Sequence, residues 1–205
     1  ATIESLGNMN LDVTRINNTN EHFTTYVDTI KTESVTEYQG SGSVNRYLPG
    51  TSGVYVYNDE SDFLHTPEGN FEVWNAYRYT RTTKETKVKT SDPSKILSGG
   101  TMQINADKVN NDKSHIIAGG ALSGTIGTLT NNPATGHHTI TSAGTVTTYW
   151  RQRESGRDHT GSSSAGYNPA AIVQTISLNT NEYQENTVPV GTRSKVDPIN
   201  TSVPN

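Results

Sequence analysis

Apolar residues occupy every second position of the segment 102–107, and polar residues occupy the positions between them. This period of two predicts a β-strand with one apolar face. The surrounding segment 96–111 aligns without a gap with the segment 116–131, at an offset of 20 residues. The matched pairs are Gly100 and Gly120, Met102 and Leu122, Ala106 and Ile126, Val109 and Leu129, and Asn111 and Asn131. The two segments are therefore interpreted as consecutive copies of one unit.

A third copy of the unit opens the chain. Its matching glycine, apolar and asparagine positions are Gly7, Met9, Leu11, Val13, Ile16 and Asn18. A repeat of about 20 residues is typical of a solenoid, in which no coil buries its apolar face alone. The sequence therefore predicts an all-β fold in which β-helix (solenoid) coils at 1–18 and 95–133 stack on one another. The alternative is three chance Gly/Asn turns between ordinary strands.

Two polar features of the repeat carry further expectations. The Gly-Gly pairs are expected to supply turns that require a positive φ. The recurring asparagines are expected to stack as a ladder of amides at one corner of the coils.

An insertion of about 75 residues, at 19–94, separates the first coil from the second. The segments 23–38 and 71–88 within it are rich in Thr, Val and Tyr, which predicts two long strands. The first segment is mainly acidic and the second mainly basic. Opposite charges that face each other across antiparallel strands are stabilising, so the two strands are predicted to pair as a long β-ribbon. The pattern leaves open whether the ribbon projects outward or folds back along the coils.

After the third copy the repeat stops again. The region 134–184 is predicted to hold a hairpin within 139–150 and a loop of small residues at 161–169. A further strand is expected at 171–178. An irregular tail is expected at 185–205, where Pro, Asn, Thr and Val dominate.

Composition narrows the class of protein. Hydrophobic residues make up only 30% of the chain and the mean hydropathy is -0.67, which fits the thin core of a solenoid better than a compact globule. The net charge of -4 gives no reason to expect nucleic acid as a partner. Cysteine is absent, which excludes disulfides and thiolate metal sites and suits export through an oxidising periplasm. The chain begins inside a repeat and has no signal peptide, so we expect a monomeric fragment of a longer protein.

Several of these segments resemble a known family. They are 96–100, 117–120, 45–47, 79–89 and, most specifically, Tyr149-Trp150-Arg151-Gln152-Arg153-Glu154-Ser155-Gly156-Arg157-Asp158. Together they resemble the haemagglutinin-repeat exoproteins of two-partner secretion, with the nearest likeness to CdiA-type contact-dependent growth inhibition effectors. The resemblance implies a right-handed β-helical filament, secreted to the bacterial cell surface through an outer-membrane β-barrel exporter. It also implies a receptor-binding region, whose partner would be an outer-membrane protein or lipopolysaccharide on a target bacterium, and toxin delivery by the parent protein.

Aromatic residues concentrate in the first insertion, and aromatic and arginine side chains are favoured at interfaces. The receptor-binding candidates are Tyr47, Tyr55, Tyr57, Phe63, Trp74, Tyr77, Arg151 and Arg153. Two alternatives stand beside this interpretation: the aromatics cover a small core, and the arginines pair with nearby acids. If the alternatives hold throughout, the chain is a purely structural stalk segment of a haemagglutinin-like adhesin.

The sequence gives no pattern for catalysis or for a cofactor. Asp158 and His159 lie close to Ser162 in the chain, but no Gly-x-Ser-x-Gly motif accompanies them. None of the six histidines shows the spacing of metal ligands. A polysaccharide-cleaving enzyme would need clustered carboxylates, and the repeats offer only Asp12 and Asp107 in matching positions. We therefore expect a binding protein and not an enzyme.

Overall fold

The computed structural model describes residues 1–58, 62–181 and 183–184, and these residues form strands, turns and irregular chain without a helix. The fold is all-β, as predicted. None of the described elements is a helix long and apolar enough to cross a membrane. The described chain forms two compact units. Unit 1 holds 1–24, 88–132 and the described residues from 180 on, and unit 2 holds 25–87 and 133–179.

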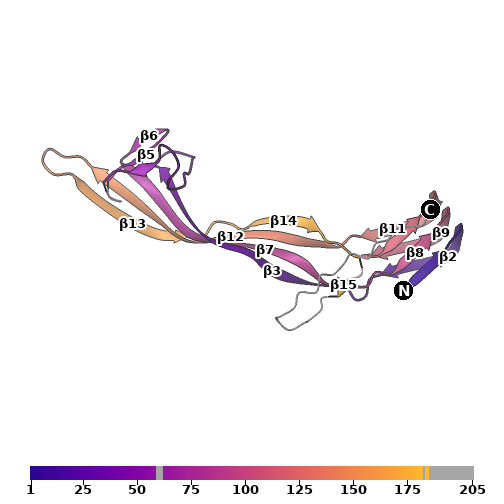
Figure 1. Cartoon of the computed structure of the whole chain (residues 1–205). Coiled ribbons are helices and arrows are strands. Elements are labelled where there is room, and N and C mark those ends of the chain that lie inside the picture. Colours follow the sequence, from indigo (N-terminus) through magenta and orange to yellow (C-terminus); the bar gives the residue numbers. More distant parts are fainter. Residues whose placement is uncertain (59–61, 182, 185–205) are drawn as a thin grey trace. The chain divides into compact units, whose positions relative to one another are not determined.

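Unit 1 consists of two parallel three-stranded sheets (Figure 1). The first has the order β1-β8-β10 and is formed by β1 (Thr2–Ser5), β8 (Lys95–Ser98) and β10 (His115–Ala118). The second has the order β11-β9-β2 and is formed by β2 (Met9–Thr19), β9 (Met102–Asp112) and β11 (Leu122–Asn132). Within both sheets the paired residues are the matched positions of the three copies, so Met102 lies between Met9 and Leu122. The predicted alignment of the three segments is confirmed.

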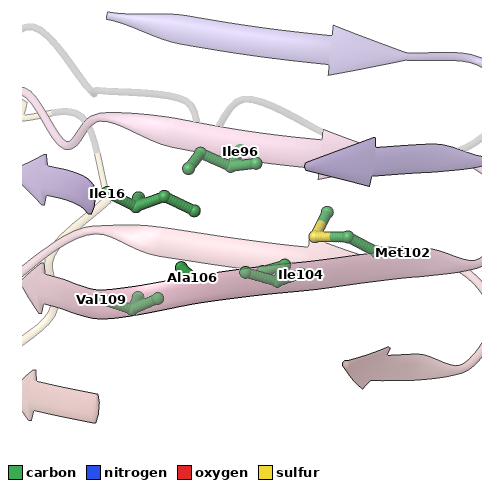
Figure 2. Close-up of a cluster of buried hydrophobic side chains, with 6 residues drawn as sticks. All are labelled: Ile16, Ile96, Met102, Ile104, Ala106 and Val109. Atoms are coloured by element: carbon green, nitrogen blue, oxygen red, sulfur yellow. The ribbon is translucent and has the colours of Figure 1, made fainter. Parts of the chain in front are cut away.

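The apolar positions of the repeat converge between the strands (Figure 2). The buried members are Ile16, Ile96, Met102, Ile104, Ala106 and Val109. The middle copy is the best covered, since Met102 is 0% and Val109 1% exposed. On the third copy, Leu122 and Leu129 remain 56% and 61% exposed beside an open cavity of about 380 Å³. The core of unit 1 is therefore well covered at the middle copy and open beside the third copy.

The asparagines form the predicted ladder. The amide nitrogen of Asn18 donates to Oδ1 of Asn111 at 2.7 Å, and the amide nitrogen of Asn111 donates to Oδ1 of Asn131 at 2.8 Å. The side-chain amides of Asn18 and Asn111 also donate to the backbone oxygens of His115 and Ser114, each at 3.0 Å. The ladder thus ties the three copies to one another and to the turn between β9 and β10.

The Gly-Gly pairs serve a different purpose from the one expected. Gly99, Gly100, Gly119 and Gly120 are not among the glycines with positive φ. A Cβ added at Gly99 would collide with the backbone oxygen of Leu6, and a Cβ at Gly119 with that of Gly99. Glycine is needed here because the backbones of successive copies approach closely, and the expectation of positive-φ turns is wrong.

Unit 2 is built on three long strands, β3 (Thr24–Gly40), β7 (Val73–Ser91) and β12 (Thr135–Gln152). β7 lies between β3 and β12, and the other edge of β12 pairs first with β14 (Ile172–Ser177) and then with β13 (His159–Tyr167). The last residues of β7 belong to unit 1, where β15 (Tyr183–Gln184) pairs with them. Strands at 23–38, 71–88 and 171–178 were predicted, and the structure confirms all three.

Ion pairs join β3 to β7 as the charge pattern predicted. The ammonium of Lys87 contacts Asp28 at 2.5 Å, and the guanidinium of Arg81 lies 3.5 Å from Glu33. Asp28 precedes Glu33 whereas Lys87 follows Arg81, so the two strands run in opposite directions. The predicted antiparallel pairing of the two strands is confirmed, and the pair forms part of a larger sheet.

Two expectations for the region 134–184 are wrong. The segment 139–150 is not a hairpin, because β12 passes through Gly144 without a break and pairs there with both β7 and β13. The segment 161–169 is not a loop, because most of it belongs to β13. Its small residues lie flat against β12, and the ring of Trp150 covers the position where a Cβ of Gly161 would project. The region pairs with the first insertion in one unit, and the expected tail at 185–205 lies outside the described residues.

A small antiparallel sheet completes unit 2. Its strands, in the order β4-β5-β6, are β4 (Tyr55–Val56), β5 (Leu64–Thr66) and β6 (Gly69–Phe71). Its inner face packs on the large sheet and closes a second core, formed by Val54, Leu64, Trp74, Ala76 and Tyr149. The region that the sequence marked as rich in aromatics is therefore a folded layer with one buried face and one exposed face.

Candidate functional site

Trp74 lies at the centre of the second core. Its side chain is 0% exposed, stacks on Tyr149 at a centroid distance of 4.7 Å and meets Tyr38 edge-on at 5.3 Å. Its indole nitrogen donates a hydrogen bond of 3.0 Å to the backbone oxygen of Asp62. A side chain with no exposed surface makes no contact with a partner, so Trp74 is a core residue and its place among the receptor-binding candidates is corrected.

The two candidate arginines are engaged within the chain. The guanidinium of Arg151 binds the carboxylates of Asp62 and Asp158, and that of Arg153 binds Glu72 at 2.5 Å. Hydrogen bonds from Arg151 lower the pKa of the Asp158 carboxyl below its ordinary value. Arg151 therefore joins β12 to the loop before β5 and to the β12–β13 turn. This pairing favours the alternative that the arginines bind local acids.

Four rings cover the exposed face of the small sheet, which we name the outer aromatic face: Tyr55, Tyr57, Phe63 and His65. Tyr55 stacks on His65 at 4.7 Å with an interplanar angle of 26°, and Tyr57 stacks on Phe63 at 4.9 Å with an angle of 8°. Tyr55 and Tyr57 are 49% and 48% exposed. Because side chains alternate along a strand, Val56 between them points to the core. Three of the predicted candidates thus lie together on one exposed face.

The remaining two candidates lie elsewhere in unit 2. Tyr47 pairs by its backbone with Tyr38 and is partly buried against the second core. Tyr77 lies on the large sheet, where the guanidinium of Arg46 sits 3.7 Å from the centre of its ring. The structure brings neither into the outer aromatic face.

The contact of Arg46 with Tyr77 belongs to an arginine–tyrosine cluster, formed by Arg46, Tyr77, Tyr79 and Tyr167. Arg46 donates to the hydroxyl of Tyr167 at 2.9 Å, and the ring of Tyr167 lies 5.0 Å from those of Tyr77 and Tyr79. Burial raises the pKa of Tyr79. These side chains satisfy one another, so the cluster stabilises the fold more than it offers contacts to a partner.

Sequence analysis missed His65 of the outer aromatic face and Tyr167 of the cluster. Tyr167 lay at the end of a predicted loop, which hid the strand alternation that directs it toward β7. His65 is one of the six histidines without metal-ligand spacing, and that spacing gives no sign of its pairing with Tyr55. The signal that would have found it is its place opposite Tyr55 in a short hairpin.

Within the described chain, no group of three His, Cys, Asp or Glu side chains is arranged to hold a metal ion. No protein-family model matches the chain, and neither the curated proteins nor the solved structures include a match. The function is therefore inferred from the chain's own geometry.

Proposed function

We propose that this chain is a receptor-recognition segment of a secreted bacterial surface exoprotein, and that it supports adhesion and contact-dependent toxin delivery to a neighbouring cell. Unit 1 is interpreted as coils of a right-handed β-helix, supported by the in-register parallel pairing of three sequence copies. Unit 2 is the recognition part. The resemblance of the Tyr149–Asp158 segment to contact-dependent growth inhibition effectors supports the same assignment, and the partner is an outer-membrane protein or lipopolysaccharide.

One observation carries the proposal: the exposure of Tyr55 and Tyr57. The inner face of the small sheet packs into the second core, where Leu64 is 0% and Val54 7% exposed. Its outer face nevertheless holds two large aromatic side chains, each about half exposed. Tyrosine combines apolar area with a hydroxyl and is enriched where proteins bind partners. A binding function explains large, half-exposed aromatics at positions outside the second core.

The alternative of a purely structural stalk segment is supported by the burial of Trp74 and the internal pairing of Arg151. These two side chains contribute to the fold of unit 2. The outer aromatic face is therefore the feature that distinguishes receptor recognition from a structural role. If the chain is a structural stalk segment, replacing Tyr55 and Tyr57 by polar residues would not change its interaction with cells.

The experiment measures binding of the fluorescently labelled chain to a panel of Gram-negative cells. We expect the double variant Tyr55→Ser/Tyr57→Ser to lose at least about tenfold in affinity for the cells that bind the parent chain, as for anchor residues of an interface. Val44→Ser is the matched control, because Val44 is 90% exposed in the same unit. Absence of binding to every cell, or equal binding by the double variant, favours the stalk.

Point substitutions are preferable to deletion of residues 40–70. The deletion would remove Leu64 and Val54 from the second core, and it would remove all of β4 and β5. Loss of binding would then reflect unfolding of unit 2.

A further inference from the structure

We infer that the β4 side of the outer aromatic face binds a neutral glycan, through the rings of Tyr55 and Tyr57. This inference rests on the proposed function and names the chemical class of the receptor. It follows from the orientation of the rings, from the described charges around them and from hydrogen-bonding groups that have no partner among the described residues.

The stacked pairs define which ring surfaces are open. Tyr55 lies on β4 and Tyr57 directly follows it, whereas their partners are His65 on β5 and Phe63 directly before β5. Each stacked pair is at about the distance that separates neighbouring strands. Each tyrosine ring therefore has one face covered by its partner. Because β4 is an edge strand of the small sheet, the opposite face of each ring is directed away from the sheet.

The two open ring faces form one surface. Tyr55 and Tyr57 are separated by one residue of a strand, so their side chains stand about 7 Å apart on the same side. Two aromatic faces in a row along a strand match the apolar faces of consecutive sugar rings, where axial C–H groups point toward the aromatic ring. A single exposed ring would offer only one such contact.

The charges around the face favour a neutral ligand. Tyr55, Tyr57 and Phe63 carry no charge at neutral pH. Among the described residues, the carboxylate of Asp62 binds Arg151, and that of Glu68 accepts hydrogen bonds from Ser43 and Asn45. No free charge on the described part of this face is thus available to pair with an acidic or basic partner.

The hydrogen-bonding groups of the face suit sugar hydroxyls. Neither phenol hydroxyl, of Tyr55 or of Tyr57, has a hydrogen-bond partner among the described residues, and a hydroxyl both donates and accepts. Nδ1 of His65 lies 2.5 Å from Oδ1 of Asn70, which as an amide oxygen only accepts. Nδ1 therefore carries the proton in the neutral ring, and Nε2 is left as an acceptor. A proline-rich peptide would present carbonyl acceptors and leave this nitrogen unused, so a glycan fits better.

The test uses the full chain and the cells that bind it. Mild periodate opens the vicinal diols of sugar rings, whereas protease treatment removes exposed surface proteins. We expect periodate to lower binding of the parent chain at least about tenfold and protease to leave it unchanged. We also expect the polysaccharide released from these cells by mild acid to bind the chain in calorimetry. Tyr55→Ala/Tyr57→Ala should weaken that binding by a similar factor.

Two controls separate ring stacking from loss of structure. Tyr55→Phe/Tyr57→Phe keeps both rings and should retain binding within about threefold, because stacking contributes more than one hydroxyl. The intrinsic fluorescence of Trp74 and Trp150 reports whether unit 2 stays folded in each variant.

Three results would overturn the inference. They are loss of binding after protease but not after periodate, undiminished polysaccharide binding by the alanine variant, and binding of a polyproline peptide in place of the polysaccharide. In the first case the tyrosine variants would still lose cell binding, so the proposed function would stand with a protein receptor. Failure of the parent chain to bind any cell would instead reject the proposed function itself.

Discussion

The asparagine ladder gives a quantitative test of how the copies of unit 1 are held together. Asn111 is the middle rung and makes three side-chain hydrogen bonds, at 2.7 Å with Asn18, 2.8 Å with Asn131 and 3.0 Å with the backbone oxygen of Ser114. Each such bond contributes about 0.5–1.5 kcal/mol net, so Asn111→Ala should lower the free energy of unfolding of unit 1 by about 2–3 kcal/mol. The loss is limited because the amide of Asn18 keeps its bond to His115.

The assay must report on unit 1, and both tryptophans of the chain, Trp74 and Trp150, lie in unit 2. Amide hydrogen exchange of β9 followed by mass spectrometry is therefore the appropriate measurement. A loss of 2–3 kcal/mol should accelerate exchange of the protected amides by about 30- to 150-fold when they exchange through opening of unit 1.

The chain offers graded controls for this experiment. Asn17 is exposed and adjacent to Asn18 on β2, so Asn17→Ala should leave exchange nearly unchanged. Asn131 is the terminal rung and accepts one bond, so Asn131→Ala should cost only about 0.5–1.5 kcal/mol. Equal exchange rates in Asn111→Ala and Asn17→Ala would refute the view that the ladder stabilises the stacked copies.

Three further predictions concern unit 2 and use urea denaturation followed by tryptophan fluorescence. Trp74→Ala should cost about 3–5 kcal/mol with Trp150 as the remaining probe, and an unchanged midpoint would contradict its place in the core. Gly144→Val should cost about 1–3 kcal/mol because its side chain would meet the backbone of Tyr79, and a stability equal to the parent's would contradict that contact. The pKa of Asp158 is lowered in the folded protein, so its ionised carboxylate stabilises the fold above about pH 4. This contribution is lost as the pH falls through the folded-state pKa. Asp158→Asn should therefore weaken the decline of the midpoint between pH 6 and pH 3, and an identical decline would exclude the carboxylate as its source.

The repeat of unit 1 was predictable from sequence because each copy pairs with the next in register. A shift of one residue would place Met102 or Ile104 on the wrong face, so the pattern has to recur at the same spacing. The long strands β3 and β7 were predictable for a related reason, since their opposite charges meet along their length.

Several failures of prediction depend on contacts that the local sequence pattern does not show. Gly144 suggests a turn from the sequence alone, but it lies within β12 and pairs with Tyr79 of β7 and Tyr167 of β13. Trp74 cannot be told from an interface residue until the small sheet covers it. The partner of Arg151 on the β5 side, Asp62, lies 89 residues away in sequence. Local patterns report none of these contacts.

The in-register pairing of β9 with β11 at an offset of 20 residues also bears on how genes for such chains can change in length. Duplication of one whole repeat adds one strand to each parallel sheet and one rung to the asparagine ladder, with every apolar side chain still directed inward. Loss or gain of a single codon within β9 would turn all later side chains of that strand to the opposite face. We therefore expect natural relatives of unit 1 to differ by whole repeats, in steps of about 60 nucleotides, and to tolerate other length changes only where the chain leaves the repeat for unit 2.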